Sequence, residues 1–465
     1  MSGDPAGPQG RSLRILAISA EVPAAVGSGG SVRAWHCLRA VARRHEVLLY
    51  LLAGNPAGEL VQALRLADCV AAGRQQSGGR PQGGRFLQSL LFSWRHQGWA
   101  LMQAGHNICV ERSGNSLTPL HWLYGWWLVL QLCVLRRLFQ LDPPDLHLRL
   151  GALVPVEQST ELRAFAADAV WIEHSYLYPL AERVCRQLSI GRILVNAHNV
   201  EHQLKQLAAV SAPNWLSRCW QLQVAAVSRQ YETRMLQTAE TIFCCSHEDC
   251  QRFLSLLPQD DSGAALLVVA NGVDTRYFQP SPEPAGANTL IFTGTAGYGP
   301  NDDAVLWLVQ ELLPAIRVQV PDVRLILAGR NADKFWGALT AGVSGVELHS
   351  DVADMRPLLG RARAAIVPLR QGSGTRFKIL EAMSMGLPVI STSLGAEGLD
   401  LVNGSQLILA DSVSEFTTAT ELILSNAEMC RKLAGAARAV VCERFDWLRI
   451  ESELELALSG IQHSA

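Results

Sequence analysis

The sequence predicts an α/β protein made of two doubly wound domains, each built on a parallel sheet. Short apolar runs of strand type alternate with helical segments up to about residue 425. The chain has 465 residues, and domains of about 150 residues would divide it into two or three. Prolines are dense at 280–286, which we interpret as the linker between the two domains.

Composition and charge exclude several classes of protein. Hydrophobic residues make up 49% and charged residues 18% of the chain, enough for large cores and against a mostly disordered protein. The net charge of −2 gives no basic field, so we expect no nucleic-acid partner. The 11 cysteines are scattered without a CxxC pair, which suits a reducing cytosol. Residues 1–11 have no apolar signal core, so we expect a cytoplasmic protein.

The N-terminal domain is expected to span residues 12–274. Its first unit is a strand at 13–19, a glycine-containing loop at 21–31, a helix at 32–44 and a second strand at 45–52. This βαβ order predicts a parallel sheet. The loop has no GxGxxG fingerprint, so Gly29 and Gly30 alone indicate phosphate binding only weakly.

Two later strands of this domain end in histidines. Residues 168–174 end at His174, and residues 192–202 form a strand followed by a polar cluster that contains His198 and His202. Ligands of open α/β sheets bind outside the carboxyl ends of the strands, so these side chains are either packed or functional. A metal site from His198, His202 and a carboxylate is an alternative. It is disfavoured because an i, i+4 pair converges on a helix and not at a strand end, so we expect no metal.

An aromatic-rich helical insertion is expected at about 85–140. Residues 113–135 lack Asp, Glu, Lys and Arg, and their most apolar part, 119–135, has 17 residues. As a helix this part would be about 26 Å long, which is short against a hydrocarbon core of about 30 Å. Three interpretations stay open: a buried or interdomain helix, a segment in the membrane interface, and a true span. The inner membrane surface is therefore an alternative location, with peripheral contact through 85–137.

The C-terminal domain is expected at 286–440. It begins with a strand at 289–294 and a loop at 295–301, and helices and strands then alternate up to the strand at 364–369. A last helix at 442–461, within residues 441–465, is expected to return to the first domain.

Residues 368–391 are the most informative stretch of the chain. A strand is followed by a tight turn containing Gly372 and Gly374, and then by a helix predicted at 375–385. The glycines permit a sharp turn and a close approach to a ligand. The helix N-terminus offers free N–H groups and a partial positive charge.

Three charged residues lie at the start of this helix. Arg376 and Lys378 add positive charge, and Glu381 can reach toward a hydroxyl group. Two cations and one carboxylate at a helix N-terminus suit a diphosphate joined to a polyol, as in a nucleotide-sugar. The simpler interpretation is an ordinary βαβ turn with solvated basic residues.

Residues 368–391 resemble the donor-binding segment of the retaining glycosyltransferases of family 4, in the subgroup with a Gly-Ser-Gly-Thr-Arg loop. The similarity covers about thirty residues, and 270–274 resembles the hinge signature of the family. It implies the GT-B fold, with two Rossmann-like domains facing across a cleft. It also implies metal-independent transfer of a sugar from a nucleoside-diphosphate sugar, with no cofactor, to a sugar or lipid-linked acceptor in polysaccharide or glycolipid assembly.

The resemblance also implies roles for individual residues. The catalytic set is His198 at the transferred sugar, Glu381 at the ribose, and Arg376 and Lys378 at the leaving diphosphate. The implied donor-binding residues are Gly29, Gly30, Gly372, Ser373, Gly374, Thr375 and, near the base, Val352. The implied acceptor side contains His174, Asn199 and His202.

Two departures from the family pattern are visible. Ser373 stands where the first of two glutamates is expected, and residues 295–301 lack the basic phosphate ligand that family members often carry. A GT-B epimerase or phosphorylase is a second enzyme interpretation, although the latter needs a cofactor lysine that is not evident. A non-catalytic GT-B subunit that scaffolds a membrane-associated polysaccharide-assembly complex is the alternative of another class.

Overall fold

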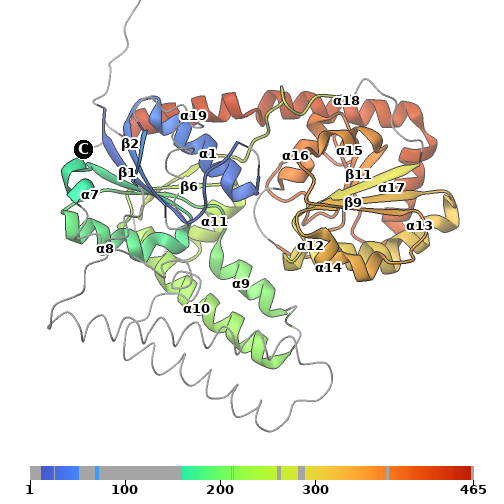
Figure 1. Cartoon of the computed structure of the whole chain (residues 1–465), viewed down its shortest axis with the longest axis horizontal. Coiled ribbons are helices and arrows are strands. Elements are labelled where there is room, and N and C mark those ends of the chain that lie inside the picture. The colour runs from blue at the N-terminus through green and yellow to red at the C-terminus, as the bar shows by residue number, and fades with distance from the viewer. Residues whose placement is uncertain are drawn as a thin grey trace, which may run out of the picture. The chain divides into compact units, whose positions relative to one another are not determined.

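The computed structural model describes residues 12–25, 27–51, 69–72, 160–210, 212, 214–258, 263–280, 288–372 and 376–461. The chain divides into two compact units. The N-terminal unit comprises residues 1–244, 249–268 and 454–465, and the C-terminal unit comprises 245–248 and 269–453. Each unit contains one parallel sheet with helices, which confirms the predicted fold class (Figure 1).

The N-terminal unit contains a sheet whose described strands follow the order β3-β2-β1-β4-β5-β6-β7, all parallel. The strands are β1 (Arg14–Ser19), β2 (Glu46–Leu51), β3 (Cys69–Ala72), β4 (Ala169–Glu173), β5 (Ile193–Asn196), β6 (Thr241–Cys244) and β7 (Ala265–Val268). The helices are α1 (Gly29–Ala42), α7 (Thr160–Phe165), η3 (Ser175–Leu177), α8 (Tyr178–Leu188), α9 (Glu201–Val210), α10 (Trp215–Thr238) and α11 (His247–Leu254). Strands β4, β5 and β6 are buried along their whole length, as expected for a parallel sheet covered on both faces.

The first helix begins earlier than the sequence predicted. Residues Gly29 and Gly30 are the first two residues of α1, whereas we expected them in a loop before a helix at 32–44. The reason is Ser28, whose side chain accepts a hydrogen bond from the Ser31 N–H at 3.2 Å and caps the helix. Helix α9 ends at Val210, and α10 begins at Trp215 after the Asn214 side chain caps it.

The C-terminal unit contains a sheet with the order β10-β9-β8-β11-β12-β13, again parallel. The strands are β8 (Thr289–Thr293), β9 (Arg324–Gly329), β10 (Val346–Ser350), β11 (Ala364–Val367), β12 (Val389–Ser391) and β13 (Ile408–Leu409). In chain order this is 3-2-1-4-5-6, the order of the dinucleotide-binding fold. The direction of winding reverses between β8 and β11, and in the N-terminal unit between β1 and β4, so each sheet has a switch point there.

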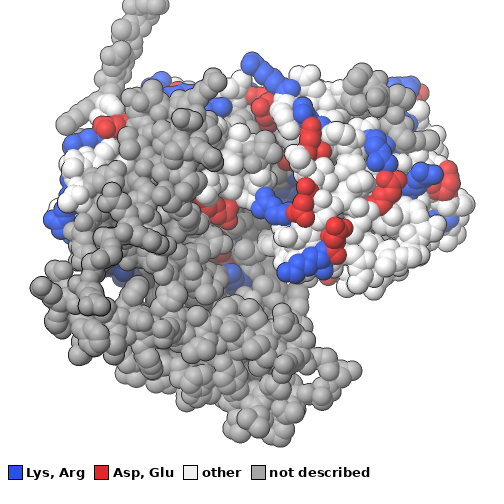
Figure 2. Space-filling view, in the orientation of Figure 1, with Lys and Arg blue, Asp and Glu red and all other residues white. Residues whose placement is uncertain are grey.

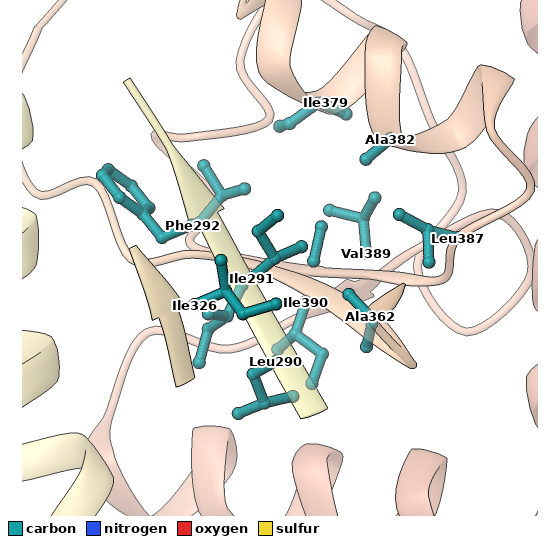
Figure 3. Packing of buried hydrophobic residues seen from close by; sticks show 14 of the residues in the cluster. Leu290, Ile291, Phe292, Ile326, Ala362, Ile379, Ala382, Leu387, Val389 and Ile390 are labelled. Carbon is teal, nitrogen blue, oxygen red and sulfur yellow. The ribbon is translucent and has the colours of Figure 1, made fainter. Parts of the chain in front are cut away.

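Helices of the C-terminal unit cover its sheet. They are α12 (Gly299–Trp307), η4 (Leu308–Leu312), α13 (Leu313–Gln319), α14 (Ala332–Thr340), α15 (Arg356–Arg361), α16 (Phe377–Ser384), α17 (Val413–Ser425) and α18 (Ala427–Arg444). Ile379 and Ala382 of α16 point toward the apolar side chains of β8 and β12 (Figure 3). Because Lys378 and Glu381 are three positions apart, they share a different face of α16.

The single helix predicted at 442–461 is wrong. The structure ends α18 at Arg444 and begins α19 (Trp447–Ile461) two residues after Phe445. The Phe445 carbonyl accepts a hydrogen bond from the Val273 N–H at 2.8 Å, and Asp446 Oδ1 accepts one from the Leu448 N–H at 2.9 Å. Both bonds stabilise the break. From Leu454 onward α19 belongs to the N-terminal unit.

Gly329 at the end of β9 provides a test of strand packing in the C-terminal unit. A Cβ at Gly329 would lie 1.7 Å from the Gly294 carbonyl oxygen, which is backbone and cannot move aside. We expect Gly329→Ala to lower the free energy of unfolding by about 3 kcal/mol, the upper range of overpacking. The control is Gly337→Ala in α14, where nothing lies within 4 Å, and which should gain about 0.5–1 kcal/mol. Urea denaturation of both variants checks this, and equal midpoints would contradict it.

Candidate functional site

The loop after β11 lies at the switch point of the C-terminal unit. Gly372 is buried and has φ +108°, a conformation that favours glycine. A Cβ at Gly372 would lie 2.7 Å from Arg376 Nη2, so the absent side chain makes room for the Arg376 guanidinium. Ser373, Gly374 and Thr375 lie outside the described residues, and their donor-binding role stays a prediction.

Lys378 lies in the first turn of α16 and points toward the loop after β8. Its Nζ donates a hydrogen bond to Asn301 Oδ1 at 2.8 Å and lies 4.0 Å from the centroid of the Phe292 ring. Burial lowers the pKa of Lys378 well below its ordinary value, the Arg376 charge lowers it further, and Glu381 opposes both. The amine therefore lacks a full counter-charge, and a bound anion would favour its protonated form.

Asn301 is a site residue that the sequence analysis missed. It lies in the first turn of α12 and is 7% exposed. Its Nδ2 donates to the Thr295 carbonyl at 2.9 Å, which fixes the carboxamide so that Oδ1 faces Lys378. A Cβ on Gly294 would lie 2.9 Å from Lys378 Nζ. Residues 295–301 contain no Lys or Arg, but Lys378 places its amine beside this loop. The sequence spacing does not reveal this contact.

Glu381 lies one turn after Lys378 on the same face of α16. Burial raises the pKa of Glu381 to about 7, and the Lys378 ammonium opposes this shift. The two groups form a coupled pair in which each partly compensates the cost of burying the other. A carboxyl group that titrates near neutral pH can accept hydrogen bonds from a ligand diol once it is ionised.

Val352 lies at the same edge of the sheet, just after β10. The turn before it is held by Asp351, whose φ is +53°. Asp351 N–H donates to the Gly329 carbonyl at 2.9 Å, and Asp351 Oδ1 accepts from the Asn331 N–H at 3.0 Å. These bonds tie the ends of β9 and β10 together. The position of Val352 agrees with a site at this edge, and its role at a base stays a prediction.

The switch point of the N-terminal unit contains a buried polar network centred on Glu173. Glu173 Oε1 accepts from Trp171 Nε1 at 2.7 Å, and Oε2 accepts from Asn196 Nδ2 at 2.8 Å. His198 Nε2 lies 2.8 Å from Oε2. Arg33, which is 1% exposed, donates from Nε to Asn196 Oδ1 at 2.9 Å. Glu173 thus contacts the His198 imidazole, Asn196 holds Glu173, and Arg33 holds Asn196.

Protonation in this network follows from burial. Burial raises the pKa of Glu173, while its hydrogen bonds and the neighbouring positive charges lower it. Burial and the charge of Arg33 lower the pKa of His198 well below its ordinary value. Both shifts favour the uncharged form of each group, so a neutral His198 is hydrogen-bonded to Glu173, and Arg33 is a neighbouring positive charge.

His174 directly follows β4 in a strained backbone conformation, with φ +84°. Its N–H donates to the Asn196 carbonyl at 2.9 Å. Its ring contacts the rings of Tyr176 and His198, at centroid distances of 4.8 and 3.8 Å. His174 and His198 thus contact each other beside the ends of β4 and β5.

His202 lies in a different environment from His198. Its Nδ1 lies 2.7 Å from Glu232 Oε2, and Glu232 Oε1 accepts from the Glu201 N–H at 2.7 Å, so Glu232 stabilises the N-terminus of α9. His198 and His202 therefore bind two different carboxylates. Among the described residues no cluster of three His, Cys, Asp or Glu side chains is arranged for a metal ion. Asn199 is partly exposed beside them.

Surface charge on the C-terminal unit is mixed. On the face shown in Figure 2, basic and acidic side chains alternate. Ion pairs join Arg370 to Asp303 and Arg361 to Glu347, each at 2.7 Å. Within the part of the chain that the structure describes, no helix has the length and apolar character to cross a membrane. The insertion predicted at 85–140 lies outside the described residues.

Comparison with known proteins gives a family match within the C-terminal unit. Residues 287–426 match the family described as Glycosyl transferases group 1. Glycogen synthase of Mycobacterium tuberculosis is 25% identical over 244 residues, 50% of this chain and 56% of that protein. An uncharacterized 44.6 kDa protein in the cps region of Klebsiella pneumoniae is 23% identical over 172 residues, 36% of this chain and 44% of its own length. The chain thus spans about half the length of these curated relatives.

Similarity to solved structures shows the fold. Anabaena HepE in complex with UDP-glucose has a TM-score of 0.60 at 13% identity and covers 96% of this chain and 100% of its own. Sucrose-phosphate synthase from Thermosynechococcus elongatus has a TM-score of 0.62 at 13% identity, covering 98% and 100%. The chain has the GT-B fold. The predicted fold is therefore confirmed, whereas membership of family 4 and of the Gly-Ser-Gly-Thr-Arg subgroup stays a prediction.

The raised pKa of Glu381 predicts a pH-dependent stability difference. Between its ordinary value of 4.5 and about 7, the unfolded chain ionises this carboxyl before the folded chain does. The folded state then binds more protons, so stability is lost as pH rises through this window. Glu381→Gln should therefore gain melting temperature relative to wild type between pH 4.5 and 7. Thermal unfolding across this pH range measures the difference in melting temperature. Glu311→Gln, at an exposed residue, is the control. Parallel curves of melting temperature against pH for Glu381→Gln and wild type would contradict the burial of this charge.

Proposed function

We propose that the protein is a retaining glycosyltransferase that moves a sugar from a nucleoside-diphosphate sugar to an acceptor. The observation that carries this proposal is the group at the switch point of the C-terminal unit, where Arg376, Lys378 and Glu381 gather at the start of α16. The match of residues 287–426 to the Glycosyl transferases group 1 family supports it.

In this proposal the cations act on the leaving group. Arg376 and Lys378 stabilise the negative charge that develops on the diphosphate as the glycosidic bond breaks, the kind of preorganised electrostatic stabilisation that is often the largest catalytic contribution. Lys378 suits this role because Asn301 fixes its amine before the ligand arrives, so less ordering is needed on binding. Protein cations replace a divalent ion, and the reaction is independent of metal.

Glu381 and the N-terminal unit complete the assignment. The Glu381 carboxylate accepts hydrogen bonds from the ribose hydroxyls, and His198 contacts the transferred sugar. In the sequence Ser373 replaces the first glutamate of the family pattern, and in this proposal Ser373 or Gly374 takes over its contact through a hydroxyl or backbone group. The named relative glycogen synthase supports a role in polysaccharide assembly, and HepE supports a UDP-sugar as the first donor to test.

Nucleotide binding is the first test. UDP, GDP and ADP should be compared by thermal shift, each with magnesium and with EDTA. We expect one diphosphate to raise the melting temperature equally under both conditions, because ligand binding to the folded state stabilises by RT ln(1 + [L]/Kd). A shift that requires magnesium would contradict metal independence, and no shift with any nucleotide would remove the donor site.

Lys378→Met tests the phosphate contact directly. Loss of one charged hydrogen bond to phosphate is worth about 1.5–3 kcal/mol, so the diphosphate Kd should rise about 10- to 100-fold. Lys334→Met is the matched control, since Lys334 is an exposed cation of α14 over the Phe335 ring. Calorimetry of both variants decides the matter: equal affinities would contradict the assignment of Lys378.

Stereochemistry separates the enzyme from a scaffold. Proton NMR of the products of UDP-sugar turnover should show the anomeric configuration of the donor. Inversion would contradict the retaining mechanism. Normal nucleotide affinity with no turnover of any donor would favour the non-catalytic scaffold.

A further inference from the structure

Helix α12 contacts the segment around Gly372 at two points. After Gly372, Lys378 Nζ donates a hydrogen bond to Asn301 Oδ1 at 2.8 Å. Before Gly372, Arg370 donates two hydrogen bonds to Asp303, which lies two residues after Asn301 in α12. The segment that carries the proposed diphosphate cations is therefore joined to one helix on either side of Gly372.

The ion pair of Asp303 and Arg370 has two-point geometry. Arg370 Nη2 donates to Asp303 Oδ1 at 2.7 Å, and Nε donates to Oδ2 at 3.1 Å. The guanidinium carbon lies 4.7 Å from the centroid of the Trp307 ring, which is buried and lies one turn after Asp303 in α12. Parallel hydrogen bonds and a cation–π contact together fix the position and the plane of the guanidinium.

The backbone at this point is held from another element. Thr392 Oγ1, which follows β12, donates to the Leu369 carbonyl at 2.5 Å, and both residues are buried. Leu369 is followed directly by Arg370, whose side chain is bound by Asp303. Main chain and side chain are thus held at adjacent residues, so the chain approaches Gly372 from one defined position.

Gly372 passes this restraint on to Arg376. Gly372 lies two residues after Arg370, and its φ of +108° commits the backbone to a conformation that other residues rarely adopt. A Cβ at Gly372 would lie 2.7 Å from Arg376 Nη2, so backbone and guanidinium are in close contact. A displacement of Arg370 would therefore move the backbone against which the Arg376 guanidinium packs.

Stability alone does not account for the pair. The side chains of Arg370 and Asp303 are 43% and 20% exposed, and water screens ion pairs of this exposure, so the pair contributes little to the free energy of unfolding. Its two-point contact restricts position more than it stabilises, because the guanidinium fork has a fixed geometry. Asp303 also occupies the Nε and one Nη of Arg370, which leaves fewer N–H groups to reach a ligand.

We propose that Asp303 and Arg370 are positioning residues, which hold Gly372 so that the Arg376 guanidinium meets the donor diphosphate. The inference rests on the proposed function, because it takes a diphosphate as the ligand of Arg376. Asp303 and Arg370 act through Gly372 and do not contact the ligand themselves.

Four variants test this role by calorimetry with UDP, GDP and ADP. We expect Asp303→Ala and Arg370→Met each to raise the Kd of the diphosphate that wild type binds about tenfold. The double variant should bind no more weakly than either single variant, because both substitutions remove the same contact. Arg370→Lys should lose as much affinity as Arg370→Met, since lysine keeps the charge but not the two-point geometry.

Arg361→Met is the matched control. Arg361 forms an ion pair with Glu347 at 2.7 Å, the same length as that of Arg370 with Asp303. It ends α15 shortly before β11 begins, and so lies at the amino edge of the sheet. We expect this variant to leave the Kd within about twofold of wild type. The melting temperatures of all variants, measured in parallel, should change little.

The other roles of the pair give different results. If Arg370 bound phosphate directly, Arg370→Met would weaken binding, Arg370→Lys would retain it, and Asp303→Ala would free the charge and bind at least as tightly as wild type. If the pair were only structural, melting temperatures would fall and the Kd would not change. Either result, or additive losses in the double variant, would overturn the inference alone. A wild-type protein that binds no diphosphate would remove the proposed function and this inference together.

Discussion

The parallel direction of both sheets is the constraint on which the rest of the structure depends. All strands of a parallel sheet bring their carboxyl ends to one edge, and the reversal of winding leaves adjacent loops diverging at one place. In the N-terminal unit this place lies between β1 and β4, and in the C-terminal unit between β8 and β11. Every charged group assigned to the site follows one of these strands or begins the helix after it.

Hydrogen bonding of the buried groups at these edges determines which charges are already compensated within the protein. Glu173 accepts hydrogen bonds from Trp171 and Asn196 and is hydrogen-bonded to the His198 ring, so its carboxyl group is compensated and holds His198. Lys378 has one carboxamide oxygen and a neighbouring Glu381 whose pKa of about 7 leaves it partly protonated near neutral pH. The first arrangement is a closed network and the second an incomplete one. An incomplete network of buried charge is where an anionic ligand gains the most.

The fold was predictable because its signals are local. Strand and helix periods, Gly372 at a positive φ and the charges of α16 can all be read from neighbouring residues. Contacts that join distant segments could not be read. Asn301 meets Lys378 across 77 positions, and Arg33 meets Asn196 across 163. The start of α1 was misplaced because the capping hydrogen bond of Ser28, and not the glycine content, determines where the helix begins.

A comparison of the first strand–helix segment of each unit shows how one fold can present opposite charges. In the N-terminal unit Gly30 packs against the Glu21 carboxylate, and in the C-terminal unit Gly294 packs against the Lys378 amine, where a Cβ would lie 3.1 and 2.9 Å from these groups. Glycine permits the same close packing in both units, but the charge of the neighbouring group differs. A cation fixed by Asn301 suits a phosphate, whereas the Glu21 carboxylate, fixed by Ser28 and Ser31, is itself an anion at the start of a helix.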